Sequence, residues 1–98
     1  MTRERELIGK ERRYLRALAH SLKPVVLVGN QGVSEAVLRA IDEALGTHEL
    51  IKVKIGGDGS EQLGTVGLRI ATTMRAELVQ VIGRMLVLYR RRKNKPTL

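Results

Sequence analysis

The fold is decided by the stretch Pro24-Val25-Val26-Leu27-Val28-Gly29-Asn30-Gln31-Gly32-Val33-Ser34-Glu35. Residues 25–28 form an apolar, mostly β-branched run between a proline and a glycine, which predicts a short buried strand. Residues 29–32 predict a tight turn, and Ser34 is a residue type that commonly caps the first turn of a helix. The stretch therefore encodes a strand, a turn and the start of a helix.

Helical spacing extends on both sides of this stretch. Apolar residues recur every three to four positions from Val37 to Leu45, and Gly46 is placed where a glycine often ends a helix. Residues 7–22 have the same spacing with basic residues between, which predicts an amphipathic helix with a basic outer face. Lys23-Pro24 ends this helix, because the residue before a proline disfavours the helical conformation.

The second half of the chain predicts three strands and a helix. Apolar residues alternate with Lys52 and Lys54 over residues 51–55, which is typical of a half-buried strand. A third helix is expected from about Ser60 to Met74, although Gly64 and Gly67 weaken it. Residues 78–82 and 85–89 predict two strands joined by a two-residue hairpin turn at residues 83–84.

The predicted order is helix, strand, helix, strand, helix, strand, strand, which is an α+β class with a mixed four-stranded sheet and helices packed on it. Crossover helices link the first three strands, so these are expected to pair in parallel, with an antiparallel hairpin closing the sheet. Residues 1–90 are expected to form one domain, followed by a basic, disordered tail over residues 91–98.

Charge is distributed unevenly along the 98 residues. The chain carries 18 Lys and Arg against 10 Asp and Glu, a net charge of +8. The net charge is +4 over residues 1–23, −2 over residues 24–83 and +6 over residues 84–98. If the fold brings the two basic ends together, they form one surface that attracts polyanions.

Composition excludes several classes. No cysteine is present, so disulfides and thiolate chemistry are absent, and no apolar run is long enough to span a bilayer. We expect a cytoplasmic protein that does not associate with membranes. The chain has no Phe or Trp, so the aromatic stacking platforms of RRM and OB-fold domains cannot form. Any RNA or DNA binding must use phosphate contacts, backbone amides and shape.

Catalytic groups are sparse. His20 and His48 are not in metal-ligand spacing, and we expect each imidazole to satisfy terminal carbonyls of a helix. The carboxylates form no paired motif, and the serines lie in no nucleophile elbow. We therefore expect no enzymatic activity and no cofactor, metal ion or small-molecule substrate.

The Gly-x-x-Gly turn between a strand and a helix has a physical use, although it is a weak signal on its own. Its glycines would let a ligand approach the backbone closely, and the first amides of the following helix carry partial positive charge. A phosphate backbone could bind there, as RNA does at the GxxG loop of KH domains. The motif alone favours a simple tight connection without a ligand over a binding site. The Walker lysine and the dinucleotide fingerprint are both absent.

Several ordered blocks together resemble one family. They are Tyr14-Leu15-Arg16-Ala17-Leu18-Ala19-His20, Leu22-Lys23-Pro24-Val25-Val26, Gly29-Asn30-Gln31-Gly32, His48-Glu49-Leu50-Ile51-Lys52-Val53-Lys54, Val79-Gln80-Val81-Ile82-Gly83 and Leu86-Val87-Leu88-Tyr89-Arg90. Over about residues 7–90 the chain is similar to the bacterial YhbY family of stand-alone CRM (chloroplast RNA splicing and ribosome maturation) domains. The resemblance implies a fold like the C-terminal domain of translation initiation factor three. It also implies an RNA-binding protein that associates with precursors of the large ribosomal subunit and assists their assembly.

The expected site combines the loop and the basic surface. Gly29, Asn30, Gln31 and Gly32 would approach the RNA backbone. Phosphate contacts would come from Lys10, Arg12, Arg13, Arg16, Lys52, Lys54, Arg90, Arg91 and Arg92. The expected partner is precursor rRNA, bound by a monomer. A basic DNA-binding protein of the nucleoid type, and a protein-interaction module that docks an acidic partner, remain the alternatives.

Overall fold

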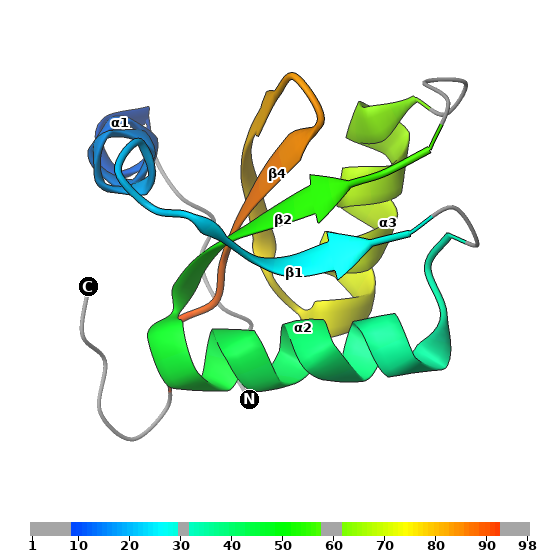
Figure 1. Ribbon diagram of the computed structural model, residues 1–98. Coiled ribbons are helices and arrows are strands. Elements are labelled where there is room, and N and C mark those ends of the chain that lie inside the picture. Colours follow the sequence, from blue (N-terminus) through cyan, green and yellow to red (C-terminus); the bar gives the residue numbers. More distant parts are fainter. Residues whose placement is uncertain (1–8, 30–31, 58–61, 93–98) are drawn as a thin grey trace.

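A computed structural model describes residues 9–29, 32–57 and 62–92. The elements follow in the order α1 (Gly9–Ala19), β1 (Pro24–Val28), α2 (Glu35–His48), β2 (Leu50–Ile55), α3 (Leu63–Met74), β3 (Glu77–Ile82) and β4 (Met85–Tyr89). This order and the mixed four-stranded sheet confirm the predicted α+β class (Figure 1).

The strands lie in the order β1-β2-β4-β3, and β4 is central. β1 pairs in parallel with β2 as predicted, and β3 and β4 form the predicted antiparallel hairpin. The prediction that the second and third strands pair is wrong, because β4 lies between them and is antiparallel to both. Leu86, Val87 and Leu88 are 0% exposed. A strand that is apolar on both faces is most stable inside a sheet, whereas the more polar β3 tolerates an edge.

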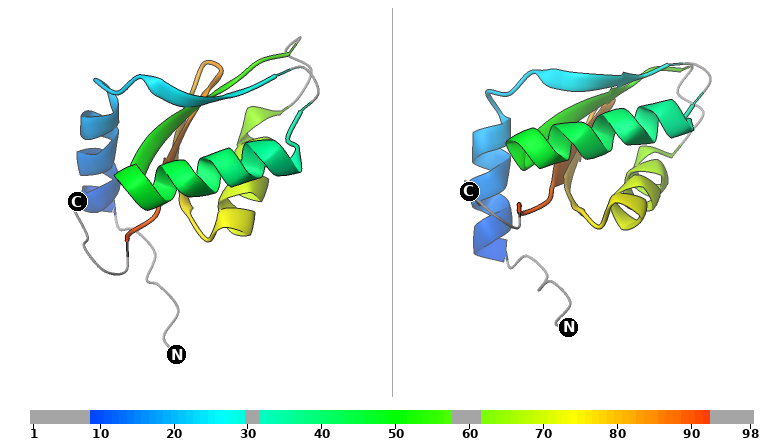
Figure 2. Two further views of the ribbon diagram at one scale, coloured as in Figure 1. Left: turned by 60° about the horizontal axis from the view of Figure 1, so that its bottom comes forward. Right: turned by 90° about the horizontal axis from the view of Figure 1, so that it is seen from below.

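The helices cover the two faces unequally. α2 and α3 pack on one face, and α1 lies across one end of the opposite face (Figures 1 and 2). The larger core cluster contains Ile41 of α2, Ile70 of α3 and Ile51 of β2. A smaller cluster joins Leu15 of α1 to Val87 and other residues of the sheet. Because side chains alternate along a strand, Lys52 and Lys54 lie on the face shared with α1.

Two predicted features of the turns are confirmed. The Ser34 side chain caps α2, accepting a hydrogen bond from the Val37 amide at 3.2 Å. Residues 83–84 form the β3–β4 turn, in which Gly83 has a φ of 56° that favours glycine.

The predicted end of α2 at Gly46 is wrong. The helix continues to His48, and the amide of Glu49 donates to the carbonyl of Leu45 at 3.1 Å. Glu49 is fully buried with a φ of 64°, a conformation that few non-glycine residues adopt. Its carbonyl accepts the Arg90 amide at 2.9 Å, and its carboxylate accepts the Arg92 amide at 2.7 Å. These tertiary contacts, rather than a glycine, fix where the helix ends.

Gly67 has a packing role that helix propensity does not reveal. It is buried, and a Cβ atom at this position would lie 3.0 Å from both Cδ atoms of Leu78. The glycine therefore lets α3 approach the sheet closely. By contrast, Gly64 has open space around it. The expected helix start at Ser60 lies outside the described residues, and the helix begins at Leu63.

The chain that follows β4 is fixed to the domain by hydrogen bonds at Arg92. Arg92, which the sequence places in the tail, bonds to Glu49 through its amide and to the Thr47 carbonyl through its guanidinium at 3.3 Å. Residues 93–98 of the predicted tail lie outside the described residues.

Candidate nucleic-acid interface

α1 covers only part of the sheet face on which it packs. The uncovered side chains form what we call the open sheet face, and they come from all four strands: Leu27, Lys52, Lys54, Gln80, Ile82 and Met85. Their register places them together, because Lys54 pairs with both Leu27 and Met85, and Met85 pairs with Ile82. Leu27 is 65% exposed and Ile82 is 49% exposed. This face is therefore an accessible surface of mixed apolar and cationic character.

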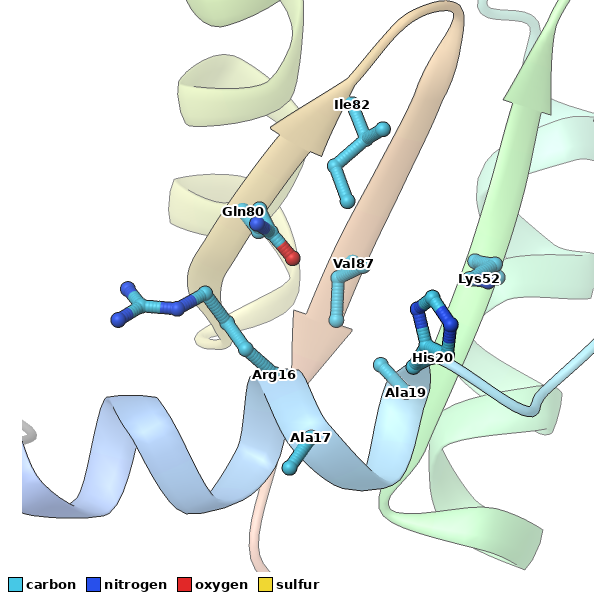
Figure 3. A pocket seen from close by; sticks show the side chains of 8 residues that line it. All are labelled: Arg16, Ala17, Ala19, His20, Lys52, Gln80, Ile82 and Val87. Carbon is cyan, nitrogen blue, oxygen red and sulfur yellow. The ribbon is translucent and has the colours of Figure 1, made fainter.

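Where the open sheet face meets α1, the surface is hollowed. The hollow has a volume of about 290 Å³ and is lined by Arg16, Ala17, Ala19, His20, Lys52, Gln80, Ile82 and Val87 (Figure 3). Cationic groups thus lie beside the exposed apolar side chain of Ile82, with no acidic side chain in the lining.

The basic side chains of α1 do not all point to solvent. Lys10 and Arg13 are exposed, and Arg16 lies at the rim of the hollow. Arg12 points inward, where its guanidinium donates to the Leu78 carbonyl at 3.0 Å and pairs with Glu77 at 3.3 Å. Arg12 therefore holds α1 against β3, and only part of its charge faces solvent.

Arg90 also has an internal role. Its guanidinium donates to the Asp42 carboxylate at 2.8 Å, to the Met74 carbonyl at 3.0 Å and to the Asp42 carbonyl at 3.1 Å. These bonds join the end of β4 to α2 and to the last residue of α3. With Arg92 bound to Glu49 and Thr47, Arg91 is the exposed member of this run.

The GxxG loop lies at the other end of the sheet. The Gly32 amide donates to the Gly29 carbonyl at 3.0 Å, and Gly32 has a φ of 84°, which favours glycine. Gly29 is exposed, with open space around its Cα and no such conformational demand. The Gly56 amide donates to the Val28 carbonyl at 2.7 Å and fixes the base of the loop. Asn30 and Gln31 lie outside the described residues.

The predicted site residues are therefore divided between the two ends of the sheet. The GxxG loop follows the end of β1, and residues 90–92 follow β4 at the opposite end, where Arg90 and Arg92 bond to residues of α2 (Figure 2). Lys52 and Lys54 lie between these ends on the open sheet face. The structure does not bring the loop and residues 90–92 together.

Sequence reasoning missed two side chains of the hollow. His20 and Gln80 both line it. The prediction that the histidines satisfy helix carbonyls is wrong, because neither imidazole bonds to any residue within the described ranges. A glutamine inside the apolar strand Glu77–Ile82 was the available signal for Gln80.

Within residues 9–29, 32–57 and 62–92, no three His, Asp or Glu side chains gather where they could hold a metal ion. In the same part of the chain, no helix combines the length and apolar character needed to cross a membrane.

The geometry defines a small α+β domain in which one face of the sheet is cationic and partly uncovered. Comparison with known proteins gives the family. Residues 7–90 match the model of the CRS1/YhbY (CRM) domain, and the chain belongs to this family.

Related proteins align with this chain over most of their length. The chain is 46% identical to an "RNA-binding protein" of Haemophilus influenzae, covering 86% of this chain and 85% of the other. It is 40% identical to "Probable RNA-binding protein YqeI" of Bacillus subtilis, covering 89% of this chain and 91% of the other. The solution structure of a candidate RNA-binding protein from Staphylococcus aureus superposes with a TM-score of 0.80 at 40% identity, covering 92% of this chain and 95% of that one.

The internal contacts of Arg90 predict a difference between two arginines. Arg90→Gln should lower the free energy of unfolding by about 1–3 kcal/mol, because it leaves carbonyls of two helices without a charged donor. Arg13→Gln, on the exposed face of α1, should change it by less than about 0.5 kcal/mol. Urea unfolding of both variants measures this difference, and equal unfolding free energies would contradict the structural role of Arg90.

Proposed function

We propose that this protein is a non-catalytic, cytoplasmic RNA-binding factor that associates with precursors of the large ribosomal subunit and assists their assembly. The relatives named above as RNA-binding proteins support the RNA part of the proposal. The family resemblance of residues 7–90 supports the ribosomal part.

The observation that carries the proposal is the distribution of available charge. Lys10, Arg13, Arg16, Lys52 and Lys54 lie on α1 or on the sheet face beside it, and none makes a hydrogen bond or ion pair to the described residues. On the other side, α2 and α3 carry the acidic Glu35, Asp42 and Glu43 together with the basic Arg39 and Arg69, so that the charges there largely cancel. One side of the molecule therefore attracts a polyanion much more strongly than the other.

RNA lies across the α1 side in this proposal. Its phosphates contact the lysines of β2 and the exposed basic residues of α1, and its backbone approaches the GxxG loop. The amides at the start of α2 add partial positive charge behind Gly32. Arg12 and Arg90 support this surface through their contacts to Glu77 and Asp42 and contribute less to phosphate binding.

Sedimentation tests the ribosomal role. In a sucrose gradient of cell lysate, the protein should co-migrate with the precursor of the large subunit, and ribonuclease treatment should abolish that co-migration. Protein that stays at the top of the gradient in low salt would contradict the ribosomal role. Complexes that survive nuclease would favour the protein-interaction alternative, and equal affinity for duplex DNA and structured RNA would favour the DNA-binding one.

Salt dependence tests the electrostatic contact. If about five or six phosphates of single-stranded RNA are neutralised, log K should fall with log salt at a slope of about −4. The double variant Lys52→Gln/Lys54→Gln should reduce this slope to about −2.5, because two contacts are lost. The control Arg39→Gln/Arg69→Gln removes the same charge from α2 and α3 and should leave the slope unchanged. A slope near zero, or equal effects of the two double variants, would contradict the proposed surface.

The loop makes a separate prediction. Gly29→Ala should fold normally, since the space around Gly29 is open, but it should weaken RNA binding by about fivefold if the backbone approaches there. Gly46→Ala is the matched control, because Gly46 also has open space but lies at the other end of α2. Gly32→Ala should instead destabilise the fold by about 1–2 kcal/mol, owing to its positive φ. Unchanged RNA affinity of Gly29→Ala would exclude a close approach at the loop.

A further inference from the structure

The hollow beside α1 brings polar side chains together from three elements. Arg16 and His20 come from α1 and the turn after it, Lys52 from β2 and Gln80 from β3. None of the four side chains makes a hydrogen bond or ion pair to the described residues. This sets them apart from Arg12 and Arg90, whose guanidinium groups are used inside the fold.

The hollow also has one accessible apolar wall. Ile82 is 49% exposed and forms this wall, whereas Val87 and Ala19 are 0% and 1% exposed and lie beneath the accessible surface. Figure 3 shows the Gln80 amide directed from β3 towards the space near Val87, and the His20 ring directed from the end of α1 towards the sheet. The Arg16 guanidinium extends outward on the side away from His20 (Figure 3).

The volume of the hollow limits which ligands it can bind. A volume of about 290 Å³ is at the lower end of small-molecule sites, which run from about 300 to 1,000 Å³. It suits one base with its sugar, and it is too small for a helix or for stacked bases. Single bases that leave a duplex are recognised by stacking on aromatic or guanidinium planes and by hydrogen bonds to their edges.

We propose that this hollow binds one unpaired nucleotide of the RNA, so that the protein distinguishes a bulged or looped base from a continuous duplex. The inference rests on the RNA binding proposed above and extends it to base recognition. The exposed Ile82 side chain contacts one face of the base, and the His20 ring stacks on the other face. The Gln80 amide, which offers both a donor and an acceptor, pairs with the base edge, and adenine is the base that glutamine contacts with two hydrogen bonds. Lys52 and Arg16 contact the flanking phosphates.

Two RNA hairpins that differ by a single bulged adenine test this inference, with binding measured by fluorescence anisotropy at one salt concentration. Wild-type protein should bind the bulged hairpin about tenfold more tightly, the size of effect that stacking of one base provides. Gln80→Ala should lose most of this preference and keep its affinity for the continuous hairpin. Gln62→Ala is the matched control, because Gln62 is an exposed glutamine at the start of α3.

Two further variants test the same contacts in case Gln80→Ala misfolds. Gln80→Glu keeps the shape of the side chain but removes its donors, and His20→Ala removes the stacking ring at an exposed position. Both should reduce the preference for the bulged hairpin and leave the unfolding midpoint unchanged. A preference retained in both variants would overturn the inference.

The remaining outcomes separate this inference from the proposed function. If wild-type protein binds both hairpins equally and Lys52→Gln/Lys54→Gln weakens both, the nucleotide site is wrong while RNA binding stands. If neither hairpin binds at low salt, RNA binding itself fails, and the nucleotide site fails with it.

Discussion

The structure depends on the burial of β4 on both faces. Leu86 and Leu88 enter the core beneath α2 and α3, while Val87 packs beneath α1, and all three are 0% exposed. A strand of this kind needs cover on each side, so helices must lie on both faces of the sheet. Two helices cover one face, but the single short helix α1 covers only part of the other. The open sheet face is therefore a direct consequence of how β4 is buried.

This constraint also divides the positive charges. Arg12 and Arg90 lie where elements meet, and their guanidinium groups bond to carbonyls and carboxylates of neighbouring elements. Lys52 and Lys54 instead alternate with core residues of β2 and have no such neighbours. The net charge of +8 thus serves two purposes. Among the described residues, Arg12 and Arg90 hold the helices and sheet together, whereas Lys10, Arg13, Arg16, Lys52 and Lys54 remain available to a polyanion on the α1 side.

Much of the fold could be predicted from local patterns, because helical and strand periodicity identify each element and Ser34 identifies the start of α2. Tertiary contacts determine the features of the fold that these local patterns did not predict. The position of β4 depends on burial from both sides, the end of α2 on the buried Glu49, and the role of Gly67 on its distance to Leu78. Sequence indicated which residues carry charge, but it could not show that Arg90 is engaged internally or that His20 and Gln80 share a hollow.

The central claim is that RNA contacts the α1 side of the sheet and leaves the α2 and α3 side free. The most direct measurement is an NMR titration of the labelled protein with a structured RNA fragment, following backbone amides on both sides. We expect shift changes at Lys52, Lys54 and Gln80 and along α1, with little change at Arg39 and Arg69. Changes concentrated on α2 and α3, with the open sheet face unaffected, would contradict it.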